Sequence, residues 1–401
     1  MPWILSITLV LGVLLLGISY YTGRRLSGSI AAHFNYPLGR VRRIVWSFLA
    51  YLNLLPLVAL AAFLIGGRAA VSAFSGDNLT VDILLTYPFW IALVINVQLL
   101  LLFVVLDLVS LSSRFLFHAA KERTKAANAR WGFYGAVVII LFSFVTIYRD
   151  TWTFRITHQE VSLPEKFACL DGLTIAHISD VQGDGRTTEQ ILMNYVEAVN
   201  NAHPDLVLFS GDLVTGGEAY IESSAKALGR LKSRYGTFAA VGDHDIFSNK
   251  RKVLANLRLE GITVLEDTTM VLRMDSCAIQ ISGVTYTYPQ RPRESKLDSL
   301  VSRSPDFYKI FLVHQPANVL VAKAQEADYQ LFLAGHTHGG GVAFGIPGFG
   351  LYSPASLESR YVSGLYHVGS LVVNVTNGLG FTLAPIRFNA PAEITILKLT
   401  K

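Results

Sequence analysis

Charged residues are scarce in this chain, and they are unevenly distributed. Only 16% of the 401 residues are Asp, Glu, Lys or Arg, whereas 51% are hydrophobic, which is too apolar for an ordinary soluble protein. Long apolar stretches occupy about positions 3–21, 45–65, 84–109 and 131–147. Each is close to the roughly 20 residues that a helix needs to cross hydrocarbon. The sequence therefore predicts a four-helix transmembrane region over residues 1–150.

The apolar stretches themselves contain almost no charge, apart from Asp107 near the end of the third. Ionisable groups inside a membrane usually mark ion or substrate paths, so their scarcity argues against a transporter and favours simple anchoring. The first stretch lacks a preceding basic region and a clear cleavage site, so we expect a retained anchor rather than a secretory signal.

Basic residues in the short loops predict the orientation of this region. The loop after the first stretch contains Arg24, Arg25, Arg40, Arg42 and Arg43, and the loop after the third contains Arg114, Lys121, Arg123, Lys125 and Arg130. The intervening loop has only Arg68. Because basic loops stay in the cytoplasm, we expect a multi-pass protein of the cell (plasma or inner) membrane with everything after Asp150 on the extracytoplasmic side. The pI of about 9.1 partly reflects these loops, so we expect the lipid bilayer as a partner and no nucleic acid.

Cysteine is nearly absent as well. Cys169 and Cys277 are the only two, and both lie in the part predicted to be outside the cytoplasm. An oxidising compartment would permit a disulfide between them. Their separation in sequence does not establish one, and buried free thiols are an equally good prediction.

Beyond residue 150, short apolar runs alternate with helical periodicity. Residues 151–169 are predicted to form a linker and a first strand. Strands are predicted at 173–178, 206–209, 238–241, 308–313, 329–334, 371–375 and 393–399, a hairpin at 270–285, and helices at 187–201, 219–233 and 250–260. This alternation predicts β-α-β crossovers around a largely central sheet, and hence an α/β domain over residues 170–401.

Asp and His side chains follow these strands where each one ends. Asp180, Asp212, Asp243 and His314 come after four successive strands, and the segment from Gly335 to Gly339 supplies His336 and His338. Functional groups collect at the carboxyl ends of strands in open α/β sheets, and neutral imidazole is the commonest metal ligand. Packing alone hardly explains five such ends, so the pattern predicts a metal site.

The order and spacing of these motifs over residues 170–400 resemble the calcineurin-like metallophosphoesterases. That family has Asp-x-His, Gly-Asp, Gly-Asn-His-Asp or -Glu, a lone His, and Gly-His-x-His. The tail segments 351–354, 361–366 and 377–380 resemble the membrane-anchored bacterial branch of the family. The resemblance implies a multi-pass α-helical membrane segment joined to an αββα sandwich, with a two-metal site at one edge of the sandwich.

The resemblance also assigns roles by position. One metal would be held by Asp180, Gln182, Asp212 and His338, and the other by Asp212, Asp243, His314 and His336, with Asp212 bridging. His244 would face the phosphoester and protonate or stabilise the leaving oxygen. Arg186 and His367 are candidate substrate contacts, with structural roles as the alternative for both.

Two positions depart from the family pattern. Gln182 stands where the family has His, and Asp243 where it has Asn. Both changes keep a donor atom, and together they remove one imidazole and add one negative charge. Harder, oxygen-richer sites suit manganese or magnesium better than zinc. We expect two divalent ions, with manganese preferred and iron, magnesium or zinc as alternatives. The same changes could instead mark a weakened site.

The expected function is that of a membrane-anchored, metal-dependent phosphoesterase. It would hydrolyse a phosphomonoester or phosphodiester, including lipid-linked ones, by means of a hydroxide shared between the metals. The Gly-rich, aromatic and uncharged segment 343–352 is either a packed loop or an apolar lip facing the bilayer. The alternative function is a non-catalytic phosphate-binding membrane sensor or scaffold with a degenerate metal site.

Overall fold

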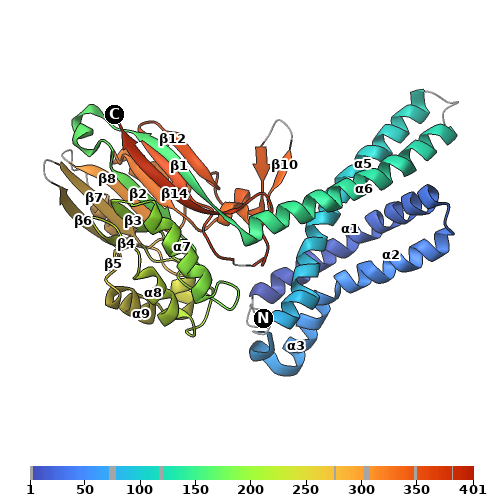
Figure 1. Cartoon of the computed structure of the whole chain (residues 1–401), viewed down its shortest axis with the longest axis horizontal. Coiled ribbons are helices and arrows are strands. Elements are labelled where there is room, and N and C mark those ends of the chain that lie inside the picture. The colour runs from blue at the N-terminus through green and yellow to red at the C-terminus, as the bar shows by residue number, and fades with distance from the viewer. Residues whose placement is uncertain are drawn as a thin grey trace. The chain divides into compact units, whose positions relative to one another are not determined.

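The structure is a computed structural model that describes residues 3–71, 78–116, 121–274, 277–301, 307–346, 350–381 and 383–401. The chain divides into two compact units, Met1–Arg149 and Asp150–Lys401 (Figure 1). The first unit is helical, and the second contains all of the described β-strands. Position 349 and its neighbours 347 and 348, in the middle of the expected apolar lip, lie outside the described residues.

The first unit consists mainly of long apolar helices. They are α1 (Trp3–Phe34), α2 (Leu38–Leu52), α3 (Leu54–Val71), the short α4 (Leu79–Val81) with a π-helical turn (Asp82–Thr86), α5 (Tyr87–Leu116) and α6 (Lys121–Trp152). Three stretches, Leu5–Phe34, Leu79–Ser113 and Ala126–Trp152, are long and apolar enough to cross a membrane. The first, third and fourth predicted spans fall on these three helices.

The second predicted span differs from a single straight helix. Residues 45–65 fall on α2 and α3, which are bent by 42° at a break and together would form either one broken span or a re-entrant loop. Pro56 has no N–H to donate to the carbonyl of Leu52, so the helical ladder is interrupted there. The amide of Asn53 donates instead to the carbonyl oxygen of Leu49, 2.8 Å away. Apolar length alone did not reveal this break.

The second unit contains two six-stranded sheets. The first has the order β1-β14-β2-β3-β4-β5, with strands β1 (Phe154–Ser162), β14 (Ala392–Thr400), β2 (Thr174–Ile178), β3 (Leu206–Phe209), β4 (Thr237–Ala239) and β5 (Thr263–Val264). The second has the order β12-β13-β9-β8-β7-β6, with strands β12 (Gly364–Val368), β13 (Leu371–Val375), β9 (Leu331–Ala334), β8 (Tyr308–Val313), β7 (Cys277–Val284) and β6 (Thr268–Met274). A separate hairpin joins β10 (Phe344–Ile346) to β11 (Gly350–Tyr352).

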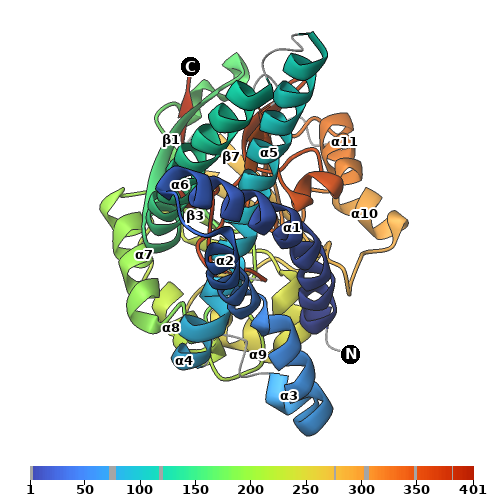
Figure 2. The ribbon, with the colours of Figure 1, turned by 90° about the vertical axis from the view of Figure 1, so that its right-hand side faces the viewer.

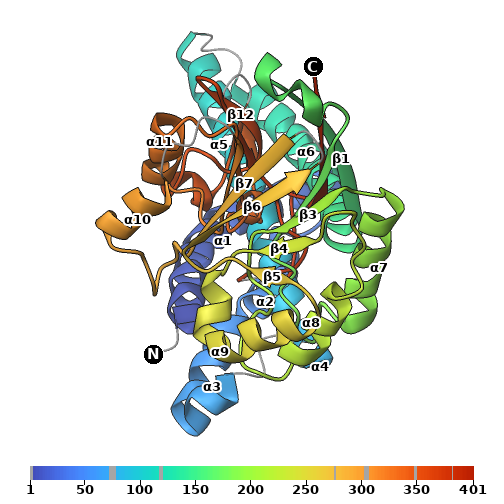
Figure 3. The same ribbon diagram turned by 90° about the vertical axis from the view of Figure 1, so that its left-hand side faces the viewer.

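Helices cover the outer faces of both sheets. The helices α7 (Glu189–Asn201), α8 (Ile221–Leu228) and α9 (Asp243–Leu259) pack on the first sheet, and α10 (Glu294–Leu300) and α11 (Asn318–Glu326) pack on the second (Figures 2 and 3). Between the two sheets lies a third apolar layer. The unit is therefore an αββα sandwich, and the prediction of this fold is confirmed.

The strand sequences explain this layering. Along β3, Leu206 and Leu208 point into the layer between the sheets, whereas Val207 and Phe209 point toward the helices. Because both faces of each central strand are buried, the strands are continuous apolar runs rather than alternating ones. Periodicity therefore predicted the strands but could not assign them to two sheets.

The parallel strands direct their carboxyl ends to one edge of each sheet. β2, β3, β4 and β5 are parallel in the first sheet, and β7, β8, β9 and β13 are parallel in the second. The segment predicted as a linker and first strand contains β1, which pairs in parallel with β14 along its whole length. The connection from α6 thus leads directly into the first sheet.

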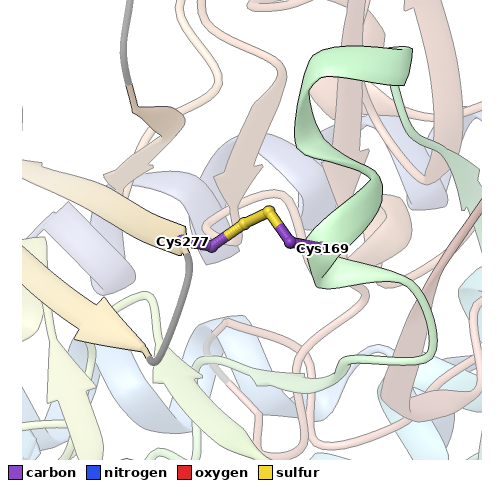
Figure 4. Close-up of a disulfide and its surroundings, with 2 residues drawn as sticks. All are labelled: Cys169 and Cys277. Carbon is purple, nitrogen blue, oxygen red and sulfur yellow. A yellow bond between two sulfur atoms is a disulfide. The ribbon is translucent and has the colours of Figure 1, made fainter.

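A disulfide joins parts of the second unit that belong to different layers. Cys169 lies in a 3-10 turn (Glu165–Leu170) before β2, and Cys277 is the first residue of β7 (Figure 4). Their Cα atoms are 6.1 Å apart, within the usual range for a disulfide. Of the two alternatives left open by the sequence, the structure has the disulfide. The disulfide lies near the amino ends of β2 and β7, whereas the Asp and His side chains follow the carboxyl ends of the strands.

Candidate metal centre and active site

Four imidazole–carboxylate contacts gather the Asp and His side chains at the carboxyl ends of the strands. Nε2 of His314, which follows β8, lies 3.3 Å from Oδ2 of Asp212 and 3.4 Å from Oδ2 of Asp243. Nδ1 of His336 lies 3.0 Å from the same Asp243 oxygen. Nε2 of His338 lies 3.3 Å from Oδ1 of Asp180. Side chains from five separate strand ends therefore meet in one buried cluster.

Two overlapping groups in this cluster have the geometry of metal sites. Asp243, His314 and His336 form one group, and Asp180, Asp212 and His314 form the other, with the ligand atoms of each group within 4.8 Å of one another. The predicted ligand Gln182 adjoins the second group, because its amide nitrogen donates to Oδ2 of Asp212 at 2.8 Å. All seven predicted ligands are thus brought together. The residue common to both groups is His314, whereas the resemblance assigned the shared position to Asp212.

The backbone of these loops is strained at the predicted ligands. Five of the seven adopt the left-handed conformation that non-glycine residues rarely take, with φ of 50° at Asp180, 50° at Gln182, 63° at Asp212, 70° at His336 and 51° at His338. Only five other described non-glycine residues do so. Strain of this kind persists where the surrounding structure enforces it, and it concentrates at functional sites.

Two glycines permit the close approach of neighbouring loops. A Cβ atom at Gly242 would overlap Oδ1 of Asp212, and one at Gly335 would overlap the side chains of Ser179 and Asp180. Glycine is therefore required at positions 242 and 335 so that Asp212 and Asp180 can enter the cluster.

Asp245 supports the cluster from behind. Its carboxylate accepts hydrogen bonds from the backbone N–H groups of Asp212, Leu213 and Gly242, at 3.0, 2.8 and 2.8 Å. Burial and the charge of Asp212 raise the pKa of Asp245 to about 6. Asp245 therefore orients the loops that carry Asp212 and Asp243.

Several buried atoms of the cluster are suited to a cation. Oε1 of Gln182 has no hydrogen-bond partner among the described residues, and Oδ1 of Asp180 and Nε2 of His338 face only each other, at 3.3 Å. Unsatisfied buried acceptors are costly, and a bound cation would remove that cost. Oxygen and nitrogen donors of these types are common ligands of divalent metals. The residues present therefore fit the predicted ions.

The electrostatics of the cluster favour positive charge. Burial would raise the pKa of Asp243, but its hydrogen bonds with His314 and His336 hold that pKa below its usual range. Burial would lower the pKa of His314, but Asp212 and Asp243 raise it well above its ordinary value. The same negative field that stabilises a proton on His314 would stabilise a divalent cation, whose binding releases that proton.

His244 lies at the start of α9, beside the cluster. Its backbone N–H donates to Oδ1 of Asp212 at 2.8 Å, and Nδ1 of its ring donates to the carbonyl oxygen of Thr215. The helix α9 is broken at Asn249, where φ is −168°, so the part after the break corresponds to the helix predicted from residue 250. An additional helical segment begins at Asp243, and His244 lies in its first turn. Its half-buried ring is therefore fixed through Nδ1, which leaves Nε2 as the atom for proton transfer.

The two candidate substrate contacts have different positions. Arg186 lies in the loop after β2, where its N–H donates to Asp184, and this loop is joined to the loop after β3 by a bridge between Gly183 and Val214. It therefore stays a candidate at the correct edge of the sheet.

His367 is not brought to the cluster. It is exposed on β12 and pairs with Val372 of β13. On its other side, Val372 pairs with Leu331, which is the first residue of β9. The His336 loop follows the opposite end of β9. The hairpin of β12 and β13 therefore carries His367 away from the site, which corrects the expectation of a substrate contact.

The structure adds residues that the sequence motifs did not reveal. Gln315 donates from its amide to Oδ2 of Asp243 at 2.9 Å, and the backbone N–H of Tyr288 donates to Oδ1 of Asp243 at 2.6 Å. Glu358 accepts from Nε2 of His336 at 3.2 Å. Of these three residues, only Gln315 lies next to a motif residue, His314, in the sequence.

Arg387 is a further residue that the motifs did not reveal, and it is almost fully buried. Its guanidinium donates to a ring of carbonyl oxygens belonging to His338, Asn377, Gly378, Gly380 and Ala390, at 2.7 to 3.3 Å. It also lies 3.4 Å from Nδ1 of His338. Burial lowers its pKa to about 10. Arg387 therefore connects His338 to the turn 377–380.

A two-sheet sandwich that gathers Asp and His from successive strand ends defines the class of metal-dependent phosphoesterases. Comparison with known proteins agrees with this assignment. Residues 173–340 match the calcineurin-like phosphoesterase family. A metallophosphoesterase of Bacillus subtilis (strain 168), YkuE, is 30% identical over 234 residues, which cover 57% of this chain and 79% of that protein. The chain belongs to the calcineurin-like metallophosphoesterase family.

Two other relatives carry more specific names. A transmembrane protein with a metallophosphoesterase domain from Danio rerio is 29% identical over 254 residues, 60% of this chain and 56% of that protein. Phosphodiesterase YaeI of Escherichia coli (strain K12) is 30% identical over 205 residues, 49% of this chain and 70% of that protein. The chain thus spans little more than half the length of the Danio rerio relative. The candidate spans and that relative together indicate a membrane protein.

Proposed function

We propose that this protein is a membrane-anchored phosphoric ester hydrolase that uses two divalent cations. The observation that supports this most directly is the buried cluster of carboxylate, amide and imidazole groups, in which several possible metal-ligating atoms are not satisfied by hydrogen bonds. One cation would be held by Asp243, His314, His336 and Asp212, and the other by Asp180, Gln182, Asp212 and His338. When bound, such ions lower the pKa of a water molecule and offset the charge of the phosphoryl oxygens.

The residues of the chain would divide the remaining work. The carboxylates and imidazoles of the cluster fix both binding positions before substrate arrives, which reduces the reorganisation needed during reaction. His244 would donate a proton from Nε2 to the leaving oxygen. Its hydrogen bond from Nδ1 to Thr215 keeps the ring oriented for that transfer.

Replacement of this proton donor is the first prediction. We expect His244→Ala to lower kcat by about 10²–10⁴-fold, the usual contribution of general acid catalysis, while metal content stays at the level of the unmodified protein. Steady-state kinetics and elemental analysis of the same preparation measure both quantities. His367→Ala is the matched control and should leave kcat unchanged. Metal loss from the His244→Ala protein would contradict the assigned role.

The substrate class is proposed as phosphodiesters or phosphomonoesters, including lipid-linked ones. The E. coli relative carries the name phosphodiesterase, which supports diesters as the first substrates to test. Turnover of an aryl phosphodiester and an aryl phosphomonoester with added Mn²⁺ would separate the two classes. A protein that binds cations and phosphate but turns over neither compound would instead be the alternative, a phosphate-binding membrane sensor or scaffold.

Manganese is the proposed preferred ion. The amide oxygen of Gln182 replaces an imidazole nitrogen of the family pattern, and the carboxylate of Asp243 replaces a neutral amide oxygen with a charged one. Sites that are richer in oxygen and more negative favour harder ions. Zinc at both positions in protein purified without added metal would refute this preference.

The extracytoplasmic side is proposed from the basic loops and is supported by the disulfide between Cys169 and Cys277, since disulfides persist in oxidising compartments. We predict that neither cysteine reacts with a maleimide polymer that is present while the protein is denatured directly from cells, and that both react when the protein is reduced first. Gel mobility reports the added mass. Two reactive thiols without reduction would contradict both the pairing in cells and the proposed side.

A further inference from the structure

His336 has a carboxylate partner outside the cluster. Glu358 follows a short 3-10 turn (Pro354–Leu357), and its Oε1 lies 3.2 Å from Nε2 of His336. The same Oε1 accepts a hydrogen bond of 2.5 Å from the hydroxyl of Tyr288. The ring of Tyr288 also meets the imidazole of His336 edge-on, with centroids 5.3 Å apart. Neither Glu358 nor Tyr288 belongs to the motifs that identify the family.

The contact with Glu358 determines which nitrogen of His336 faces the cluster as an acceptor. A neutral imidazole has one N–H, and a carboxylate oxygen can only accept. Each ring nitrogen of His336 meets a carboxylate, Nδ1 that of Asp243 and Nε2 that of Glu358. If a cation took the place of a proton on Nδ1, the remaining proton would stay on Nε2, toward Glu358, and the lone pair of Nδ1 would face the cation. Nδ1 is the atom that lies 3.0 Å from Oδ2 of Asp243 and 3.3 Å from Nε2 of His314. The tautomer set by Glu358 is thus the one able to bind a cation.

Tyr288 holds Glu358 in this position while it is itself tied to the cluster. Its backbone N–H donates to Oδ1 of Asp243, and its hydroxyl donates to Glu358. One residue therefore connects a candidate ligand, Asp243, to the partner of a second ligand, His336. Such outer partners orient metal-binding imidazoles and increase their basicity.

We propose that Glu358, anchored by Tyr288, is a positioning residue that fixes His336 to present Nδ1 to the cation of the Asp243–His314–His336 group. This inference rests on the proposed two-cation function. The side chain of Glu358 is 41% exposed and Tyr288 is 55% exposed, so both lie at the rim of the site. Exposed residues of this kind can be replaced with little effect on folding, so their effect on metal binding can be measured separately.

The test is the affinity of the full-length protein in detergent for Mn²⁺, measured by calorimetry and by the electron paramagnetic resonance of bound Mn²⁺. We expect Glu358→Ala to weaken one of the two binding events by about 10–100-fold and to leave the other unchanged. Glu358→Gln keeps an acceptor oxygen and should restore most of the affinity. Tyr288→Phe should give a smaller loss than Glu358→Ala, because the acceptor stays but loses its anchor.

Glu222→Ala is the matched control, since Glu222 is an exposed glutamate on α8 that pairs with Lys226, and it should leave both events unchanged. Unchanged Mn²⁺ affinity in Glu358→Ala, with two binding events in the unmodified protein, would overturn the inference and leave the proposed function standing. Absence of Mn²⁺ binding in the unmodified protein would overturn both. Equal losses in Glu358→Gln and Glu358→Ala would also contradict the role, because the acceptor oxygen would then not matter.

Discussion

Asp212→Asn is expected to reduce hydrolysis by roughly 10³-fold or more. Removing one preorganised charged group from a site of this kind costs about 10²–10³-fold, and Asp212 is placed to serve both cations. The amide also fits poorly. Oδ1 of Asp212 accepts from the N–H of His244, and Oδ2 accepts from the amide of Gln182. Either orientation of an Asn side chain would place its NH₂ group against one of these donors.

Asp328→Asn is a closely matched control for this variant. Asp328 also adopts the left-handed conformation, with φ of 57°, but it is exposed and follows α11 away from the cluster. The kinetics and metal content of Asp328→Asn should match those of the unmodified protein, whereas Asp212→Asn should lose both activity and bound metal. Activity of Asp212→Asn within a few-fold of the unmodified protein would refute the bridging role.

Arg387→Met is expected to destabilise the second unit by about 3–5 kcal/mol, because it leaves a buried ring of carbonyl oxygens without donors. For a unit of this size that corresponds to a fall in Tm of about 10 °C. We also expect weaker metal binding at His338, since the turn 377–380 and the His338 loop lose their common partner. Thermal unfolding followed by circular dichroism, together with metal titration, measures both effects.

Arg387→Lys distinguishes the hydrogen-bonding pattern from the charge. A lysine retains the positive charge, but its donors radiate from a single nitrogen and cannot reach carbonyls that Arg387 bonds through two nitrogens. We expect only partial recovery of Tm. Arg155→Lys, at a half-exposed arginine that pairs with Glu393, serves as the control and should change Tm little. If Arg387→Met had the same Tm as the unmodified protein, the hydrogen bonds from Arg387 to the carbonyl ring would not stabilise the fold.

The parts of the structure that depend on local pattern were predictable from the sequence. The strand predicted at 206–209 is β3, and Asp212 follows it at the functional edge as expected. The apolar run predicted as a strand at 173–178 is β2, and Asp180 follows it at the same edge. These predictions succeeded because strand period and strand ends are properties of neighbouring residues.

The parts that depend on distant contacts were not predictable in this way. Glu358 meets His336 across 22 positions, and Arg387 meets His338 across 49, and neither contact leaves a pattern in the sequence. His367 was placed near the site from its position in the tail, but the antiparallel turn between β12 and β13 reverses its direction. The break between α2 and α3 depends on Asn53 and Pro56, which an apolar stretch of sufficient length concealed.

The most direct test of the two-cation centre is anomalous X-ray scattering from crystals of the full-length protein purified without chelator, measured on both sides of the manganese and zinc absorption edges. The account predicts two peaks on either side of the Asp212 carboxylate, about 3.5–4 Å apart, with the stronger signal at the manganese edge. A single peak, or peaks away from Asp180, Asp212, Asp243, His314, His336 and His338, would contradict it.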